Sequence, residues 1–155
     1  MKVYIASSFN LISKVIALEE ALEKAGHVIT TKWWKRAYNI PTEGLVHTTE
    51  LKKRYDALSS QEFYSRSECK LSFEFDFKGV KDAEALIFVA DDNPRAYNGA
   101  NIELGIALGN NKPCLSIGAL NNSVMYYPVL KCNTLQELLD HLSCLQDSLS
   151  KTTLE

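Results

Sequence analysis

Short apolar runs alternate with segments of helical periodicity along most of the chain. Residues 3–6 are rich in β-formers, and residues 85–90 form an unbroken apolar run, which is typical of a strand covered on both faces. Apolar positions recur at helical spacing from Leu11 until Gly26, a residue that can end a helix. The same patterns predict further strands at 27–34, 113–117 and 126–130, and further helices at about 61–81, 100–110 and 134–148.

This alternation of strands and helices predicts the fold class. We expect an α/β protein with a doubly wound, flavodoxin-like, mainly parallel five-stranded sheet and helices on both faces. Residues 35–60 lack a sustained period and predict an excursion over the sheet edge. In the helix at 61–81, we expect three apolar side chains to face inward, with Asp76 on a neighbouring face; they are Phe73, Phe77 and Val80. At the end of the chain, Thr134 can cap the last helix together with Glu137.

Length, composition and charge narrow the classes of function. The 155 residues fit one domain, which we expect over 1–148, with a frayed tail over 149–155. The net charge is −2 and no stretch concentrates Lys or Arg, so we expect no nucleic acid polymer as partner. The four cysteines lack C-x-x-C spacing, and we expect no metal and no organic cofactor. The chain also has neither a signal-peptide pattern at its start nor an apolar run of ~20 residues, which favours the cytoplasm and excludes a membrane partner.

Candidate binding residues follow the predicted strands. In parallel sheets, ligands bind beyond the carboxyl ends of the strands. Glu103 is expected in the first turn of the helix after the central strand, where the helix dipole favours an ionised carboxylate. An alternative is that Glu103 only complements this dipole. The other candidates at this edge are Ser7, Ser8, Phe9, Asn10, Asp92, Asn93, Gly99 and Ala100, of which the last two add little bulk beside a planar ligand.

Three segments carry a resemblance to a known family. Residues 98–109 read N-G-A-N-I-E-L-G-I-A-L-G and are followed by Lys112-Pro113, which resembles the nucleophile motif of the nucleoside 2-deoxyribosyltransferase family, including related nucleoside monophosphate N-glycosidases. Residues 3–6 with Phe9 resemble the first strand and substrate loop of that family, and residues 76–84 resemble its D-x-x-G-I helix. The three segments stand in the order found in the family and span most of residues 1–117.

The resemblance implies a role for each candidate. Glu103 would attack the anomeric carbon of the sugar and form a covalent glycosyl-enzyme, and Tyr4 would orient it. Asp76 or Asp92 would protonate the departing base, a choice left open because Tyr97-Asn98 stand where the family often has an aspartate. Tyr4 could equally be a core aromatic residue. The residues expected to contact substrate are Ser7, Ser8, Phe9, Asn10, Asn93, Gly99 and Ala100, although the serines and Asn10 could also serve as helix caps.

Several functions remain open from the sequence. The leading hypothesis is an enzyme, a nucleoside 2-deoxyribosyltransferase that moves 2-deoxyribose between bases, and its rival is a nucleoside 5′-monophosphate N-glycosidase that uses water. A non-catalytic nucleotide sensor or an NAD-cleaving module is an alternative of another class, although the absence of G-x-G-x-x-G disfavours ordinary dinucleotide binding. The expected partners are a small nucleoside or nucleotide and further copies of the chain, as a homo-oligomer (dimer or higher), which the apolar segment 125–128 favours.

Overall fold

A parallel sheet organises the molecule. The computed structural model describes residues 1–36, 59–65, 67–90, 98–120 and 124–152. Within these residues the strands are β1 (Lys2–Ala6), β2 (Val28–Ile29), β3 (Ala85–Val89), β4 (Cys114–Ile117) and β5 (Leu130–Cys132). All neighbouring strands pair in parallel, in the order β2-β1-β3-β4-β5. This order is that of flavodoxin-like folds, and the expected fold class is confirmed.

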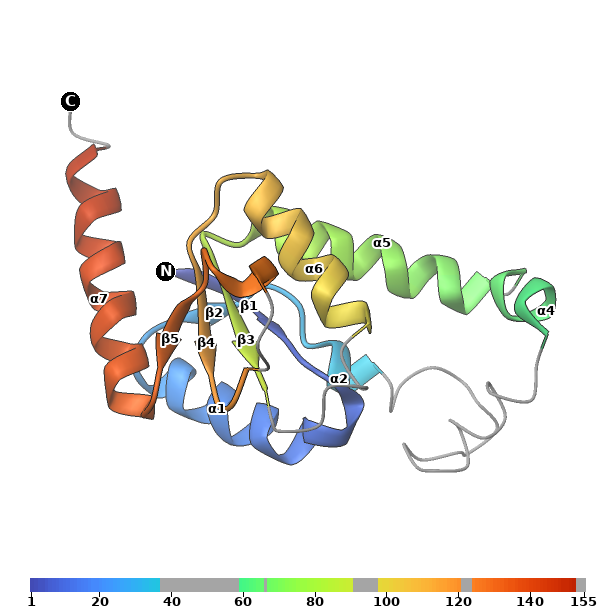
Figure 1. Cartoon of the computed structure of the whole chain (residues 1–155), viewed down its shortest axis with the longest axis horizontal. Coiled ribbons are helices and arrows are strands. Elements are labelled where there is room, and N and C mark those ends of the chain that lie inside the picture. The colour runs from blue at the N-terminus through green and yellow to red at the C-terminus, as the bar shows by residue number, and fades with distance from the viewer. Residues whose placement is uncertain (37–58, 66, 91–97, 121–123, 153–155) are drawn as a thin grey trace.

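Helices cover both faces of the sheet (Figure 1). Helices α5 and α6 pack against one face, while α1 and α7 pack against the other. Right-handed crossovers between parallel strands account for α1, α5 and α6, whereas α7 follows the last strand. The bounds of the helices are η1 (Phe9–Leu11), α1 (Ile12–Lys24), α2 (Trp33–Arg36), α4 (Ser60–Tyr64), α5 (Ser67–Asp82), α6 (Asn98–Gly109), η2 (Val124–Tyr126) and α7 (Leu135–Thr152). The first helix ends as expected, before Gly26, whose φ of 85° suits glycine.

The two central strands form the middle of the core. Every residue of β3 is buried, as is every residue of β1 after Lys2. Tyr4 lies level with Leu86 across the β1–β3 pair, and its hydroxyl reaches α6. Because side chains alternate between the faces of a sheet, this contact assigns Tyr4 to the face that α5 and α6 cover. The strand thus places a tyrosine directly under the helix that carries Glu103.

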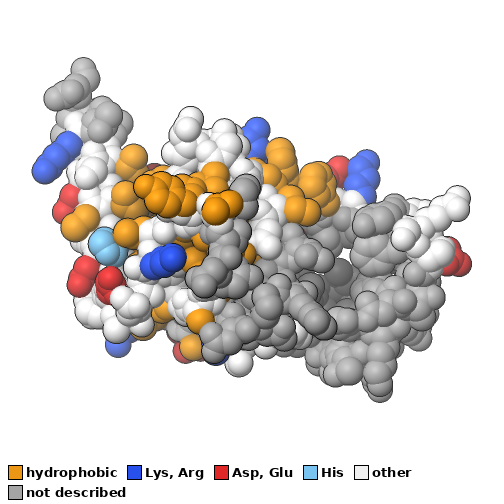
Figure 2. Space-filling view, viewed as in Figure 1, with side chains coloured by type: hydrophobic (Ala, Val, Ile, Leu, Met, Phe, Trp, Pro, Cys, Tyr) orange, Lys and Arg blue, Asp and Glu red, His pale blue; other side chains and the backbone are white. Residues whose placement is uncertain are grey.

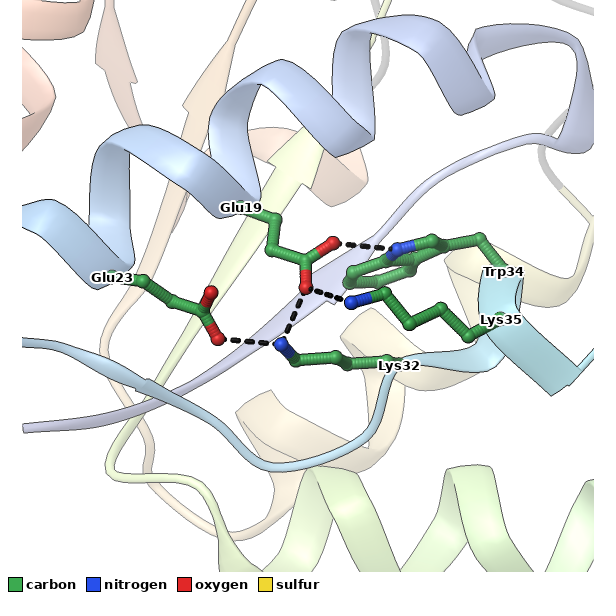
Figure 3. Close-up of polar contacts among 5 residues, drawn as sticks. All are labelled: Glu19, Glu23, Lys32, Trp34 and Lys35. Atoms are coloured by element: carbon green, nitrogen blue, oxygen red, sulfur yellow. Dashed lines mark hydrogen bonds and ion pairs between the residues drawn. The ribbon is translucent and has the colours of Figure 1, made fainter.

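The strand expected over 27–34 is wrong beyond Ile29. Trp33 begins α2, and its indole Nε1 donates a hydrogen bond to the Ile5 carbonyl at 2.7 Å. The Trp34 indole donates to Glu19 on α1 at 2.8 Å. These side-chain hydrogen bonds hold the segment against β1 and α1, so tertiary contacts override its β propensity. Lys32 and Lys35 complete the cluster around Glu19 (Figure 3).

The expected inward positions of Phe73 and Phe77 are also wrong. Phe73 is 60% exposed and Phe77 is 38% exposed, whereas Val80 is buried as expected. The two rings lie one turn apart and stack on each other, with 5.7 Å between their centroids. Their apolar surface is thus covered partly by each other and not by the sheet. Of the excursion expected over 35–60, residues 37–58 lie outside the described residues.

The C-terminal part differs from expectation at one strand. Tyr126 belongs to η2, where its ring packs against Phe88 with 5.7 Å between centroids, and β5 begins only at Leu130. The cap of α7 is confirmed, since the Thr134 hydroxyl oxygen accepts a hydrogen bond from the Glu137 amide at 3.1 Å. Helix α7 continues to Thr152, so residues 149–152 are helical where we expected a frayed tail, and residues 153–155 lie outside the described residues.

Candidate active site

Glu103 and Tyr4 form a hydrogen-bonded pair between α6 and the sheet. The Tyr4 hydroxyl donates to the Glu103 Oε1 carboxyl oxygen at 2.8 Å. Tyr4 is fully buried and Glu103 is partly buried. Since Tyr4 stands on a central strand, its hydroxyl is a fixed donor that holds the carboxyl group of Glu103 in one orientation.

The surroundings of Glu103 favour its protonated form. Burial raises the pKa of the Glu103 carboxyl to about 8, and the negative charge of Asp76 adds to this shift. The hydrogen bond from Tyr4 acts in the opposite direction, but burial outweighs it. A carboxyl group with so high a pKa, next to a second carboxylate, is typical of sites that do acid–base or nucleophilic chemistry.

Asp76 belongs to the same group. It lies on α5, which packs beside α6, and its side chain is partly buried. Its negative charge raises the pKa of Glu103, as the smallest of the three influences on that carboxyl group. The structure therefore brings together Glu103, Tyr4 and Asp76 from three separate elements, α6, β1 and α5.

The expectation that Glu103 lies in the first turn of its helix is wrong. Helix α6 begins at Asn98, two residues before the expected start, and its first turn contains no acidic residue. The carboxyl group thus lies beyond the amides that the helix leaves unpaired, so the dipole has little effect on it. Desolvation is the largest influence on the pKa of Glu103, and it raises this pKa where the dipole was expected to lower it.

The first loop lies at the carboxyl edge of β1. The Ser7 hydroxyl donates to the Val89 carbonyl at 2.9 Å, which joins the exits of β1 and β3. Ser8 is buried, and its hydroxyl oxygen accepts a hydrogen bond from the Asn10 amide at 3.3 Å. Asn10 is exposed, and the backbone of Phe9 belongs to η1. Both serines therefore have structural contacts in addition to any role in binding.

The start of α6 places its two small residues differently. Gly99 is exposed, and a Cβ atom added to it would meet no atom within 4 Å. The Ala100 side chain is buried in the core, so only its backbone could meet a ligand. Asp92 and Asn93, the remaining sequence candidates, lie outside the described residues.

A separate hollow lies on the other side of the molecule. Its volume is about 310 Å³, and Leu115, Leu130, His141, Cys144 and Leu145 are among its lining residues, which belong to β4, β5 and α7. It contains none of Tyr4, Asp76 and Glu103. Its apolar walls hold no pair of carboxylates, so we attach no chemistry to it.

No cluster of side chains suited to a metal ion occurs in the described residues. None of the helices described is both long and apolar enough to cross a bilayer.

Gly79 belongs to the segment that resembles the D-x-x-G-I helix, but the sequence predicted neither its contact nor that of Thr31 between α5 and Tyr4. A Cβ atom on Gly79 would lie 2.1 Å from the Thr31 hydroxyl oxygen and 3.1 Å from Tyr4 Cδ2. A glycine inside a helical pattern is unfavourable for the helix and often marks a close approach, and this signal could have identified Gly79. Thr31 lay in a segment that was expected to be a strand, and nothing in the sequence pointed to its contact with α5.

Known structures share this fold. No protein-family model matches the sequence, and no curated protein matches it. The structure is similar to a 2-deoxyribosyltransferase from the psychrotolerant bacterium Bacillus psychrosaccharolyticus, with a TM-score of 0.65 and 18% identity over 90% of this chain and 91% of that one. It is also similar to a CMP N-glycosidase of Clostridium botulinum, with a TM-score of 0.48 and 14% identity over 93% of this chain and 99% of that one. At such identities the first likeness establishes the fold, and the second adds nothing to it.

Proposed function

We propose that the protein is an enzyme that cleaves the N-glycosidic bond of nucleosides or nucleotides, and specifically a nucleoside 2-deoxyribosyltransferase. The observation that carries this proposal is the hydrogen bond of 2.8 Å between Tyr4 and Glu103, with the charge of Asp76 acting on the same carboxyl group. The sequence motifs around these residues and the fold shared with a 2-deoxyribosyltransferase support it.

The proposed reaction has two displacements. A Glu103 carboxylate oxygen attacks the anomeric carbon of 2-deoxyribose, and the bond from that carbon to the base nitrogen breaks. The departing base takes the electron pair together with a proton. A second base then attacks the glycosyl-enzyme from the vacated side and gives the proton of its attacking nitrogen to the acid that protonated the first base, which releases Glu103 and gives net retention. The sugar binds where Tyr4 fixes the orientation of the nucleophile.

Protonation determines when Glu103 can act. With a pKa of about 8, Glu103 is ionised in roughly one molecule in ten at pH 7. Two neighbouring carboxyl groups disfavour the state in which both are ionised, so they tend to hold one proton between them. We propose that this proton moves to Asp76 as Glu103 attacks, and passes from Asp76 to the departing base. Asp76 is thus our candidate for the general acid.

Ser7 of the first loop suits a sugar hydroxyl better than a 5′-phosphate, whereas the hydroxyl proton of Ser8 is not used by its contact with the Asn10 amide. A phosphate dianion has only acceptor oxygens and needs donors around it. The one hydroxyl proton of Ser7 is donated to the Val89 carbonyl, so Ser7 can only accept a hydrogen bond from a ligand. A sugar hydroxyl can supply that donor. This contact is a reason to place the transferase ahead of the monophosphate N-glycosidase.

The test compares two substrate mixtures. The protein is incubated with deoxyinosine plus adenine, and separately with deoxynucleoside monophosphates alone, and the products are separated chromatographically. Base exchange without free sugar supports the transferase, whereas free base with sugar phosphate establishes the hydrolase. Nucleotide binding without turnover of either mixture would refute an enzyme and favour a sensor.

The nucleophile is tested with a matched pair of variants. Glu103→Gln should lower turnover by several orders of magnitude, because an amide cannot form the glycosyl ester. Glu20→Gln makes the same change at an exposed position of α1 and should leave turnover unaltered. Turnover retained in Glu103→Gln would contradict the covalent mechanism.

We also propose that the protein forms a homo-oligomer. Apolar side chains lie exposed along α5 (Figure 2), and among them Leu71, Phe73 and Phe75 are each at least half exposed. Such surfaces commonly mark contacts between proteins. Light scattering coupled to size-exclusion chromatography would measure the mass, and a monomer at micromolar concentration would contradict the proposal.

A further inference from the structure

Helix α5 approaches the sheet closely at a glycine. A Cβ atom on Gly79 would lie 2.1 Å from Thr31 Oγ1, 2.7 Å from Thr31 Cβ and 3.1 Å from Tyr4 Cδ2. Thr31 and Tyr4 are themselves buried, so neither can swing into solvent. Any side chain at position 79 would therefore push α5 and the segment after β2 apart, or displace the Tyr4 ring.

Two threonines hold α5 at this short distance. The Thr30 hydroxyl donates to the Gly79 carbonyl at 2.8 Å, and the Thr31 hydroxyl donates to the Phe75 carbonyl at 3.4 Å. Both threonines follow β2, whereas both acceptors belong to α5. These hydrogen bonds join α5 to the segment after β2 at the place where Gly79 allows the two to approach closely.

The contact lies on the face of α5 that serves the candidate site. Asp76 and Gly79 are three residues apart, so they share a helix face. Gly79 contacts the ring of Tyr4, whose hydroxyl donates to Glu103. This one close contact therefore determines where the Tyr4 ring lies under α5 and where Asp76 lies beside it. We infer that Gly79 is a positioning residue, which through Tyr4 and Asp76 fixes the geometry around Glu103.

This inference rests on the proposed function, and kinetics of three variants test it. Gly79→Ala should lower kcat by about 100-fold, as a displacement of about 1 Å does in an active site, with a much smaller change in KM. Gly109→Ala is the matched control, because a Cβ atom there meets nothing within 4 Å and the residue lies at the end of α6. Alanine is more favourable than glycine inside a helix, so Gly79→Ala does not weaken α5 itself.

Removal of the clashing partner should restore activity. Thr31→Gly in the background of Gly79→Ala deletes the two atoms nearest to the new methyl group and leaves only the looser contact with Tyr4 Cδ2, so kcat should recover most of the loss. A role in folding alone would instead lower the melting temperature and the amount of active protein without changing kcat per active site. If Gly79→Ala does not fold, Thr31→Val replaces it, since it removes the hydrogen bond to Phe75 without adding bulk.

A readout without substrate separates this inference from the proposed function. NMR titration of carbon-13-labelled glutamate, assigned to Glu103 by its loss in Glu103→Gln, gives the pKa midpoint in each variant. The midpoint should move in Gly79→Ala and return in the double variant. Unaltered kcat in a folded Gly79→Ala, or an unmoved Glu103 midpoint, would overturn the inference. A wild-type protein without glycosidic turnover would refute the proposed function, while the titration would still decide the role of Gly79.

Discussion

The protonation of Glu103 depends on two neighbours that act in opposite directions. Tyr4 donates to the carboxyl group and lowers its pKa, whereas the charge of Asp76 raises it. Each neighbour can be removed with little change of shape, by Tyr4→Phe or by Asp76→Asn. The pair of variants therefore separates the two effects on one side chain.

We expect the two variants to shift the Glu103 titration to opposite sides of the wild-type midpoint of about 8. Tyr4→Phe should raise the pKa because the ionised form loses a hydrogen bond, and Asp76→Asn should lower it because a negative charge disappears. NMR titration measures both midpoints. Shifts in the same direction would contradict the assignment of these two effects.

The same carboxyl group should make folding dependent on pH. Its pKa is about 8 in the folded protein against 4.5 in an unfolded chain, so the unfolded chain ionises first as the pH rises. Stability is therefore lost between pH 4.5 and pH 8, and the loss stays constant above that range.

Glu103→Gln removes this loss. The variant should match the wild type in stability below pH 4.5 and exceed it by a few kcal/mol above pH 8. Urea unfolding at pH 4 and at pH 8.5 measures both differences. Equal stability at pH 8.5 would mean that the carboxyl group ionises as readily in the folded protein as in the unfolded chain.

At the residue scale, the sequence predicted that Tyr4 orients Glu103, and the two side chains are hydrogen-bonded, but it did not predict the protonation of the carboxyl group. Motif order and small neighbours single out the glutamate as a candidate. Its pKa depends on burial between α6 and the sheet, and on an aspartate from α5. Neither contact follows from neighbours in the chain, and a helix start misplaced by two residues was enough to suggest a larger effect of the dipole than the structure allows.

At the scale of elements, Lys112 caps the C-terminal end of α5. Its ammonium group donates to the carbonyl of Lys81 at 2.6 Å and to that of Ala83. Carbonyl groups at the end of a helix have no partner within the helix, and a cation there also complements the dipole. The lysine of the Lys112-Pro113 pair thus has a structural role, next to its place in the sequence motif.

Lys112→Met should destabilise the protein by about 2 kcal/mol, because it keeps the stem of the side chain and removes charged hydrogen bonds. Lys14→Met is the control, since Lys14 is exposed on α1. Urea unfolding measures both variants. Equal losses for the two would show that the contact of Lys112 contributes nothing specific.

Sequence patterns predicted elements well where the pattern itself determines the structure. The apolar runs of β1 and β3 are buried on both faces, which the residue types alone indicate. The prediction for the segment after β2 was wrong because its two tryptophans donate hydrogen bonds to Ile5 and Glu19 through their indole groups. Those partners are distant in sequence, so no local pattern reveals them.

At the scale of the whole molecule, a buried charge joins α1 to α2. Glu19 is 3% exposed and accepts from Trp34 and Lys35, with Lys32 also in contact (Figure 3). Burial raises the pKa of Glu19, but the hydrogen bonds from the two lysines and the tryptophan lower it by more, so it lies below its ordinary value. Since the folded pKa is depressed, the cluster stabilises the protein above pH 4.5 and loses this effect as the pH falls through the folded pKa.

Glu19→Gln should lower stability at pH 7 by roughly 3 kcal/mol, because it leaves buried donors without their charge partner. The difference from the wild type should shrink in acid, where Glu19 becomes protonated. Glu20→Gln, one residue along α1 and exposed, is the control. Unfolding followed by tryptophan fluorescence measures the effect, since Trp34 is buried against Glu19. A difference that does not depend on pH would contradict a role for the charge.

Glu19 and Glu103 make opposite contributions to the dependence of stability on pH. Acid removes the contribution of Glu19, and a pH above 4.5 brings in the cost of Glu103. The parallel sheet and the helices on both of its faces follow from the alternation of patterns, and they were predicted. The placement of these two buried carboxyl groups was not, because each is defined by side chains that only the folded chain brings together.

The central position of β1 affects how the chain can fold during synthesis. Strand β1 is synthesised before its partner, because it pairs with β3 at residues 85–88, and Tyr4 meets Glu103 across 99 residues. Contacts of such sequence separation form slowly. A nascent chain that ends before β3 exposes the apolar side chains of β1 without their main partner. The half-synthesised protein is therefore the form most open to aggregation, and the candidate site is among the last features to assemble.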